Sequence, residues 1–101
     1  MASSKGRAEH AVMRLSPRDN IVVALRTLKA GESVALDGDF LKIGRGVAVG
    51  HKIAARAIAK GEIIYKYSCP IGIALTAIAA GETVQPNNVE TRYLPTDTLP
   101  P

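Results

Sequence analysis

A short pattern built on a Gly-Glu pair occurs three times in this sequence, and it limits what the chain can fold into. The copies are LRTLKAGESV (residues 25–34), ARAIAKGEII (55–64) and LTAIAAGETV (75–84). Each copy has one apolar residue three positions before the glycine and another three positions after it. The glycines are separated by 30 and then by 20 residues. Because a solenoid needs a fixed period, this spacing indicates one turn motif used three times within one small domain.

Each copy reads as a strand, a turn that ends at the glycine, and a second strand, since glycine adopts a positive φ cheaply. Further strands are predicted over residues 20–26 and 62–67, on both sides of the tight turn DGD (37–39), and in TVQ and NVETRYL around Pro86. The segments before Gly61 and Gly81 are each predicted as a strand followed by a single helical turn. The expected fold class is all-β with short helical turns.

Length and composition fit one domain flanked by two tails. The chain has 101 residues, of which 47% are hydrophobic and 22% are charged, as in an ordinary soluble domain. Residues 1–18 are polar without a clear period and are predicted to form a flexible N-terminal arm. Residues 94–101, LPTDTLPP, form a Pro-rich C-terminal tail that cannot be regular structure. The domain itself is predicted to span residues 19–93.

Charge and cysteine content narrow the classes of function. The net charge is +4, but no cluster of lysine and arginine with interleaved aromatic residues occurs, so we expect no nucleic-acid partner. A mildly basic surface suits small anions or an acidic protein partner. The single cysteine, Cys69, excludes an internal disulfide. No apolar run approaches the roughly 20 residues that span a bilayer, and no signal core is present, so a cytoplasmic protein is expected.

Three stretches resemble the SAF domain at the N-terminus of altronate and galactarate dehydratases. They are DNIVVALRTLKAGE, VGHKIAARAIAKGEIIYKYSCPIGIA and TAIAAGETVQPNNVE, which together cover about residues 19–90. The resemblance implies the β-clip fold, a compact set of short bent strands. The dehydratases continue into a large catalytic region, but split versions pair a small SAF-like subunit with a large one. Family members commonly carry His-x-His-Asn where this chain has QPNN, so Asn88 matches the motif and both histidines are missing.

The resemblance implies the small subunit of a hydroxy-acid lyase of the altronate/galactarate dehydratase or sulfolactate sulfo-lyase type, acting with a separate large catalytic subunit. The reaction would be a β-elimination that removes a proton α to a carboxylate and expels water or another leaving group such as sulfite. A divalent metal, iron or another ion, would be held mainly by the large subunit and would stabilise the enediolate.

Two alternatives stay open. One is a non-catalytic SAF module that binds a small sugar acid or a protein partner, since a fold does not fix a function. The other is a chain that only stabilises its partner, which the missing histidines favour. The sequence also leaves open whether the chain forms a homo-oligomer.

His51 is the candidate catalytic residue. It is the one histidine between residues 19 and 93, and a neutral imidazole can act as a general base near neutral pH. A lone histidine after a glycine is more often a structural or surface residue, but the GHK match to the family implies that Gly50, His51 and Lys52 line an active site. No second histidine, cysteine cluster or carboxylate cluster accompanies His51, so we predict no metal site in this chain alone.

Four residues besides Gly50 are candidates for binding the substrate. Lys52 and Arg56 are four positions apart and are predicted to lie on the same face of a strand, where they would hold substrate carboxylates; a solvated strand face is the alternative. Lys66 is the candidate in the YKY stretch, with both tyrosines on the opposite face. The resemblance adds Asn88.

Four other residues are predicted to be structural. The glutamates after the turn glycines recur with the repeat, so they are expected to accept backbone N–H groups of the turns rather than to catalyse; they are Glu32, Glu62 and Glu82. Cys69 precedes Pro70 in a turn and is also expected to be structural.

Overall fold

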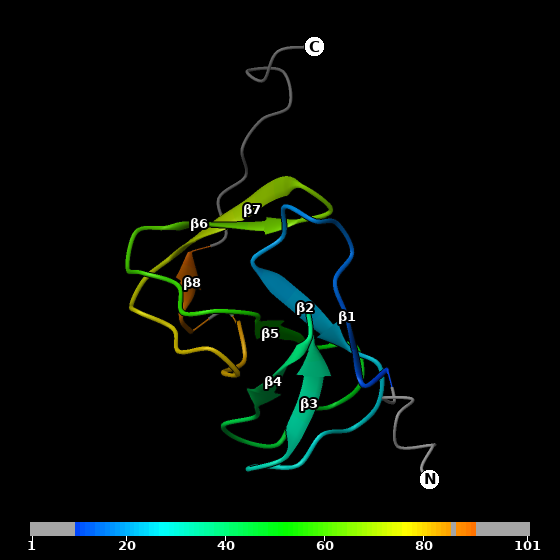
Figure 1. Ribbon diagram of the computed structural model, residues 1–101. Helices are drawn as coiled ribbons and strands as arrows, with labels where there is room; N and C mark the ends of the chain where they lie inside the picture. Colours follow the sequence, from blue (N-terminus) through cyan, green and yellow to red (C-terminus); the bar gives the residue numbers. More distant parts are fainter. Residues whose placement is uncertain (1–9, 86, 91–101) are drawn as a thin grey trace, which may run out of the picture.

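The computed structural model describes residues 10–85 and 87–90, and these residues form strands and turns without a helix. Eight short strands make three antiparallel sheets with the orders β1-β2-β5, β3-β4 and β6-β7-β8 (Figure 1). None of the described residues form a helix that could cross a membrane. The strands are β1 (Val12–Met13), β2 (Ile21–Ala24), β3 (Ser33–Leu36), β4 (Asp39–Lys42), β5 (Lys52–Ala54), β6 (Ile63–Lys66), β7 (Cys69–Ala74) and β8 (Val89–Glu90).

Four equivalent turns connect these strands, one more than the sequence pattern revealed. We number them turn 1 (residues 25–31), turn 2 (44–50), turn 3 (55–61) and turn 4 (75–81). Each turn ends at a glycine whose φ lies between 84° and 89°. Turn 2 went unnoticed because the residue after its glycine is His51, where the other three turns have glutamate.

The turns interlock in pairs through backbone hydrogen bonds. Leu28 of turn 1 and Val47 of turn 2 each donate an N–H to the other's carbonyl, over 2.8 and 2.9 Å. Ile58 of turn 3 and Ile78 of turn 4 exchange the same two bonds, both 2.8 Å long. The prediction of a single helical turn in turns 3 and 4 is therefore wrong: pairing with a distant turn takes the backbone groups that a helix would use and overrides the helix propensity of alanine.

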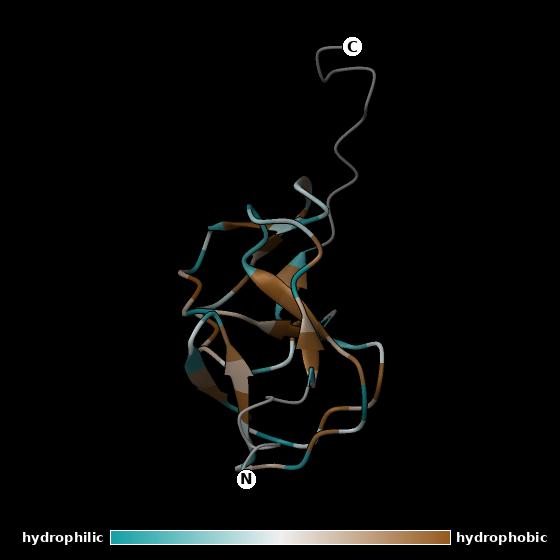
Figure 2. Cartoon of the chain, turned by 45° about the vertical axis from the view of Figure 1, so that its right-hand side comes forward, coloured by the Kyte–Doolittle hydropathy of each residue, from teal (hydrophilic) through white to brown (hydrophobic). Residues whose placement is uncertain are grey.

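Each interlocked pair encloses its own hydrophobic core, and β2 and β5 contribute to both. The apolar residues that flank each Gly-Glu pair are all buried, with at most 5% of their surface exposed, as the repeat predicts; they are Leu28, Val34, Ile58, Ile64, Ile78 and Val84. Figure 2 shows hydrophobic residues along the central strands, and hydrophobic stretches alternating with hydrophilic ones on the connections. Val22 of β2 and Ile53 of β5 belong to the first core, whereas Ile21 and Ala54 belong to the second.

The domain begins earlier than predicted. Residues 10–18 were assigned to a flexible arm, but β1 pairs with β2 in the register Val12↔Ala24 and Met13↔Val23. Ala11 and Val12 are buried in the first core. Two apolar residues are too few to show a period, which explains the error. Residues 1–9 and the predicted tail 94–101 lie outside the described residues.

Two hairpins occupy opposite ends of the molecule, and both turn through residues with positive φ (Figure 1). The DG turn of β3–β4 was predicted, and Asp37 and Gly38 are there at φ 54° and 80°. In β6–β7 the equivalent residues are Tyr67 and Ser68 at φ 57° and 62°, although hairpin turns of this kind favour Asn-Gly or Asp-Gly. The second hairpin therefore needs support from elsewhere.

That support comes from Asp19, which is only 2% exposed. Its carboxylate accepts the N–H groups of Tyr67 and Ser68 at 2.8 and 2.7 Å. The neighbouring Asn20 adds two bonds: its side chain donates to the carbonyl of Ile63 and accepts the N–H of Tyr65, each at 2.9 Å. Two adjacent buried polar residues thus attach the β6–β7 hairpin to the start of β2.

Replacing Asp19 with alanine should lower the free energy of unfolding by about 2–4 kcal/mol, because two backbone N–H groups of a strained turn lose their acceptor. Urea unfolding measures this loss. Asp39→Ala is the control, since the Asp39 side chain is exposed and, among residues 10–85 and 87–90, accepts only the adjacent N–H of Phe40. The effect of this substitution should stay within about 0.5 kcal/mol. Equal effects of the two substitutions would contradict the role of Asp19.

Gly61→Ala and Gly81→Ala should differ sharply in their effect on stability, although the φ angles of the two glycines, 86° and 89°, are nearly equal. At Gly61 nothing lies within 4 Å of an added Cβ, so only the backbone strain of about 1–2 kcal/mol applies. At Gly81 the Cβ would lie 1.8 Å from the carbonyl oxygen of Lys42, so turn 4 must move. We expect a loss of about 3 kcal/mol or more for Gly81→Ala in urea unfolding. Similar losses would show that turn 4 does not pack closely on β4.

Candidate functional site

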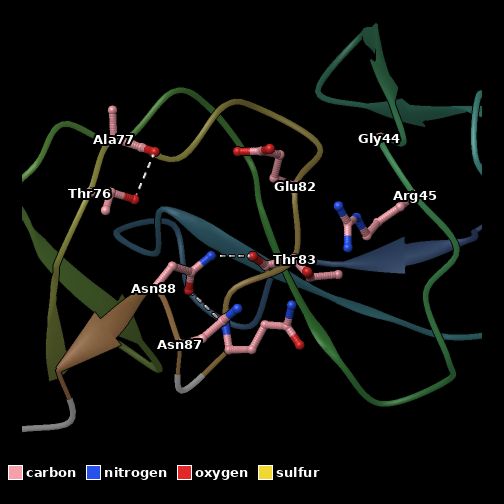
Figure 3. A pocket seen from close by; sticks show the side chains of 9 residues that line it. Gly44, Arg45, Thr76, Ala77, Glu82, Thr83, Asn87 and Asn88 are labelled. Carbon is pink, nitrogen blue, oxygen red and sulfur yellow. Dashed lines mark hydrogen bonds between the residues drawn. The ribbon is translucent and has the colours of Figure 1, made fainter.

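A hollow of about 370 Å³ lies where turn 2 begins beside turn 4 (Figure 3). Its lining comes from two residues of turn 2, from turn 4 and from the segment that follows turn 4. Most of the side chains that face it are polar or charged, and they include Arg45, Thr76, Glu82, Gln85, Asn87 and Asn88.

Backbone pairing on two sides holds the hollow open. The N–H of Gly44 donates to the carbonyl of Gly81 over 3.2 Å, which fixes the start of turn 2 against the end of turn 4. On the other side Thr83 forms an isolated antiparallel bridge with Ile53, where a longer strand TVQ was predicted. The walls are thus built by residues far apart in sequence.

Asn88 shapes the wall formed by residues 83–88. Its side-chain amide donates to the carbonyl of Thr83 and its side-chain oxygen accepts the N–H of Gln85, each over 2.9 Å (Figure 3). The side chain predicted to bind substrate therefore lines the hollow while its hydrogen bonds fold the loop. The neighbouring Gln85 and Asn87 are exposed and present their amides to the hollow.

The glutamates of the repeat have the structural role that was predicted. The carboxylates of Glu32, Glu62 and Glu82 accept backbone N–H groups three positions earlier, those of Lys29, Ala59 and Ala79, at 2.7–2.9 Å. Each bond links the residue after the turn glycine back to a backbone N–H within the turn, and so stabilises the turn. We call the residue after each turn glycine the glutamate position, and the second residue of each turn the arginine position.

In turns 1 and 3 these two positions form ion pairs, Arg26 with Glu32 and Arg56 with Glu62. The hydrogen bond from Arg56, followed by that from the Ala59 N–H, lowers the pKa of Glu62 below its ordinary value of 4.5. The same ion pair raises the pKa of Arg56. In turn 1, Arg26 and the Lys29 N–H lower the pKa of Glu32.

Arg56 does not lie where the sequence placed it. Strand β5 ends at Ala54, so Lys52 and Arg56 do not share a strand face and that prediction is wrong. The Arg56 guanidinium bonds Glu62 and the carbonyl of Ala57. Alternation along a strand fails here because turn 3 begins at residue 55.

Turns 2 and 4 fill the two positions differently. Turn 2 has Arg45 at the arginine position and His51 at the glutamate position, whereas turn 4 has Thr76 and Glu82. Neither Arg45 nor Glu82 forms an ion pair with another described residue. Both line the hollow. Sequence reasoning missed Arg45 because turn 2 lacks the Gly-Glu pair of the repeat. The available signal was its position five residues before Gly50, which matches those of Arg26 before Gly31 and Arg56 before Gly61.

Gly50, His51 and Lys52 of the predicted site do not line the hollow. The backbone carbonyl of Lys52 accepts the N–H of Val84 over 2.9 Å, next to the bridge between Ile53 and Thr83, so this segment contacts the chain between the lining residues Thr83 and Gln85. His51 is exposed, and its imidazole makes no hydrogen bond with the described part of the chain. Lys52 is half-buried in β5, and Lys66 ends β6 opposite Cys69, away from the lining residues.

A metal ion would not find its ligands within residues 10–85 and 87–90 alone. No three or more histidine, cysteine, aspartate or glutamate side chains group there in a way that could hold one. Structural and catalytic sites for divalent metals usually take three or four protein ligands. The described residues therefore do not fit a resident metal by themselves.

Comparison with known proteins identifies relatives of this domain. The model of the altronate/galactarate dehydratase SAF domain matches residues 10–92. The chain is 42% identical over 79 residues to altronate dehydratase of Escherichia coli K12, and 33% identical over 79 residues to that of Bacillus subtilis. These matches take in 78% of the chain but 16% of either enzyme, so the chain spans about one sixth of their length.

A third relative is much shorter. The chain is 32% identical over 77 residues to the (2R)-sulfolactate sulfo-lyase subunit alpha of Chromohalobacter salexigens. The match covers 70% of the chain and 82% of that subunit. The same domain thus forms a small part of one relative and most of another.

The Arg56–Glu62 pair makes stability depend on pH. Glu62→Gln keeps an oxygen for the Ala59 N–H but removes the charge, so it should lower the free energy of unfolding by about 0.5 kcal/mol at pH 7. Because folding lowers the pKa of Glu62, the carboxylate's contribution is fully present above pH 4.5 and is lost as the pH falls through the folded-state pKa. Urea unfolding from pH 7 to pH 3 should show the two proteins converging in acid.

The control is Glu82→Gln, which keeps the backbone acceptor at a position without an arginine partner and should change stability less at pH 7. A constant difference between wild type and Glu62→Gln across the whole pH range would contradict the ion pair as its source.

Proposed function

The chain belongs to the altronate/galactarate dehydratase SAF domain family, and from this premise we propose that it acts as the small subunit of a hydroxy-acid lyase. It works together with a separate large catalytic subunit. The match to most of a sulfo-lyase subunit alpha supports a small-subunit role. The reaction is a β-elimination: a base removes the proton α to the carboxylate, the electrons of that C–H bond form a carbon–carbon double bond, and hydroxide or sulfite leaves the adjacent carbon with its bonding electrons. Hydroxide takes up a proton from an acid in the site and departs as water, and the enol that forms tautomerises to the 2-oxo acid.

The polar hollow is the observation that carries this proposal. It joins one cation, one carboxylate, hydroxyls and amides in about 370 Å³, near the lower end of the range typical of small-molecule sites. A short hydroxylated acid offers a carboxylate and several hydroxyl groups, which match this lining. The hollow also includes Gln85, Asn87 and Asn88, the positions where relatives of this domain carry their His-x-His-Asn motif.

We assign the proton-moving role at the edge of the hollow to His51. Its imidazole is exposed and next to Lys52, whose carbonyl bonds the N–H of Val84, so it is free to approach a substrate that extends beyond the lining residues. A neutral imidazole can accept a proton as a general base, and the imidazolium can return it as a general acid. Lys52 is the neighbouring cation that would hold an anionic group there. Arg56 and Lys66 have no part in this assignment, because Arg56 is paired with Glu62 and Lys66 lies at the end of β6, opposite Cys69.

The large subunit supplies what the described residues lack. A divalent metal, iron or another ion, is held mainly by that subunit in this proposal, since residues 10–85 and 87–90 do not assemble a ligand set. The small subunit binds the hydroxy-acid, orients it and keeps water from its edge of the site.

The test uses the purified chain with and without a large subunit that resembles the remaining five sixths of altronate dehydratase. Altronate, galactarate and sulfolactate are the substrates, and formation of a 2-oxo acid and release of sulfite are measured. We expect turnover with both components and none with either alone. His51→Ala should lower kcat by about 100-fold or more while the complex still forms.

His10→Ala is the matched control, because His10 lies at the start of the described residues, remote in sequence from the hollow. Loss of activity in both variants would point to a general effect on folding. A stable complex that turns over none of the three acids would overturn the lyase role and leave a binding module. Failure of the two components to associate would overturn the split-subunit arrangement.

A further inference from the structure

Turns 2 and 4 each keep one member of the ion pair that turns 1 and 3 contain. Turn 2 retains Arg45 but has His51 at the glutamate position. Turn 4 retains Glu82 but has Thr76 at the arginine position. In the other two turns the paired charges neutralise each other and close the turn.

Both retained charges line the hollow. The bond from the Gly44 N–H to the Gly81 carbonyl joins the residues that immediately precede Arg45 and Glu82. Figure 3 shows both side chains on neighbouring segments, with Asn87 and Asn88 across from them. Among the described residues Arg45 has no hydrogen-bond partner, and Glu82 uses one oxygen for the Ala79 N–H. One guanidinium and one carboxylate oxygen that line the same hollow are therefore without a partner among the described residues.

We propose that Arg45 and Glu82 bind a polyhydroxy monocarboxylate together, with the guanidinium on its carboxylate and Glu82 on its hydroxyl groups. This assignment rests on the proposed function and adds its ligand-binding residues and selectivity. An arginine holds a carboxylate through two parallel N–H bonds, and an ionised carboxylate accepts hydroxyl protons strongly. The exposed amides of Gln85 and Asn87 add neutral donors and acceptors between them.

The pair also predicts which acids are rejected. A ligand whose carboxylate binds Arg45 and whose carbon chain extends across the hollow brings its other end to Glu82. A hydroxyl group there donates to Glu82, whereas a second carboxylate is repelled by it. The site therefore selects sugar acids with one carboxylate over the corresponding diacids, and Glu82 is the residue that determines this selectivity.

The experiment titrates gluconate and galactarate into the full chain and follows binding by calorimetry and by backbone amide shifts. We expect wild type to bind gluconate more tightly than galactarate. Arg45→Ala should weaken both by about 10–100-fold, the range for hydrogen bonds to charged groups. Glu82→Gln keeps the acceptor for Ala79 and should weaken gluconate, strengthen galactarate and reduce the preference by about tenfold or more.

Arg56→Ala and Glu62→Gln are the matched controls, because they change the same two positions in turn 3, away from the hollow. They should leave both affinities unchanged. The absence of saturable binding, equal losses in Arg45→Ala and Arg56→Ala, or an unchanged preference in Glu82→Gln would each overturn the assignment. These binding results are independent of turnover. Selective binding without lyase activity would refute only the enzymatic role. Lyase activity together with unchanged selectivity in Glu82→Gln would refute only the role of Glu82.

Discussion

The reciprocal backbone bonds between turns are the interaction on which the rest of this molecule depends. Leu28 with Val47, and Ile58 with Ile78, hold together segments about 20 residues apart, and each apolar side chain points into a core behind its own pair. The strands are only two to six residues long, which is too short to form a stable sheet without these hydrogen bonds between turns. Turn geometry, rather than strand length, decides this fold.

One consequence is that the side chains at the arginine and glutamate positions can change without breaking the backbone hydrogen bonds between the turns. The backbone bonds are the same in all four turns, while the arginine and glutamate positions vary. In turns 1 and 3 these positions form an ion pair within the turn, whereas turns 2 and 4 each place one charged side chain in the lining of the hollow. The candidate site is therefore a modification of a structural motif, built from positions that elsewhere serve only stability.

Much of this architecture could be predicted from residues alone. The Gly-Glu repeat located three turns, their buried flanking residues and the hydrogen-bonding role of the glutamates. These features could be predicted because a glycine with positive φ and buried apolar residues at fixed distances from it form a local sequence pattern. The DG hairpin was visible for the same reason. The resemblance to dehydratase SAF domains is confirmed by the family match over residues 10–92.

The errors share a physical cause, which is that the deciding contact was distant in sequence. Alanine-rich turns 3 and 4 looked helical because the bonds between Ile58 and Ile78 cannot be read locally. Asp19 was predicted only as the first residue of the domain and received no role, because its partners are 48 and 49 residues away. Arg45 drew no attention because its relation to Glu82 exists only after turns 2 and 4 come together.

The shared strands β2 and β5 carry a last implication. Adjacent residues of each strand enter different cores, Ile21 and Ala54 the second, Val22 and Ile53 the first. Neither core is complete without both strands, so neither half of the chain is an autonomous folding unit. The molecule should lose its structure in one cooperative step, and two fragments separated within turn 2 should recover it only by reassociating with each other.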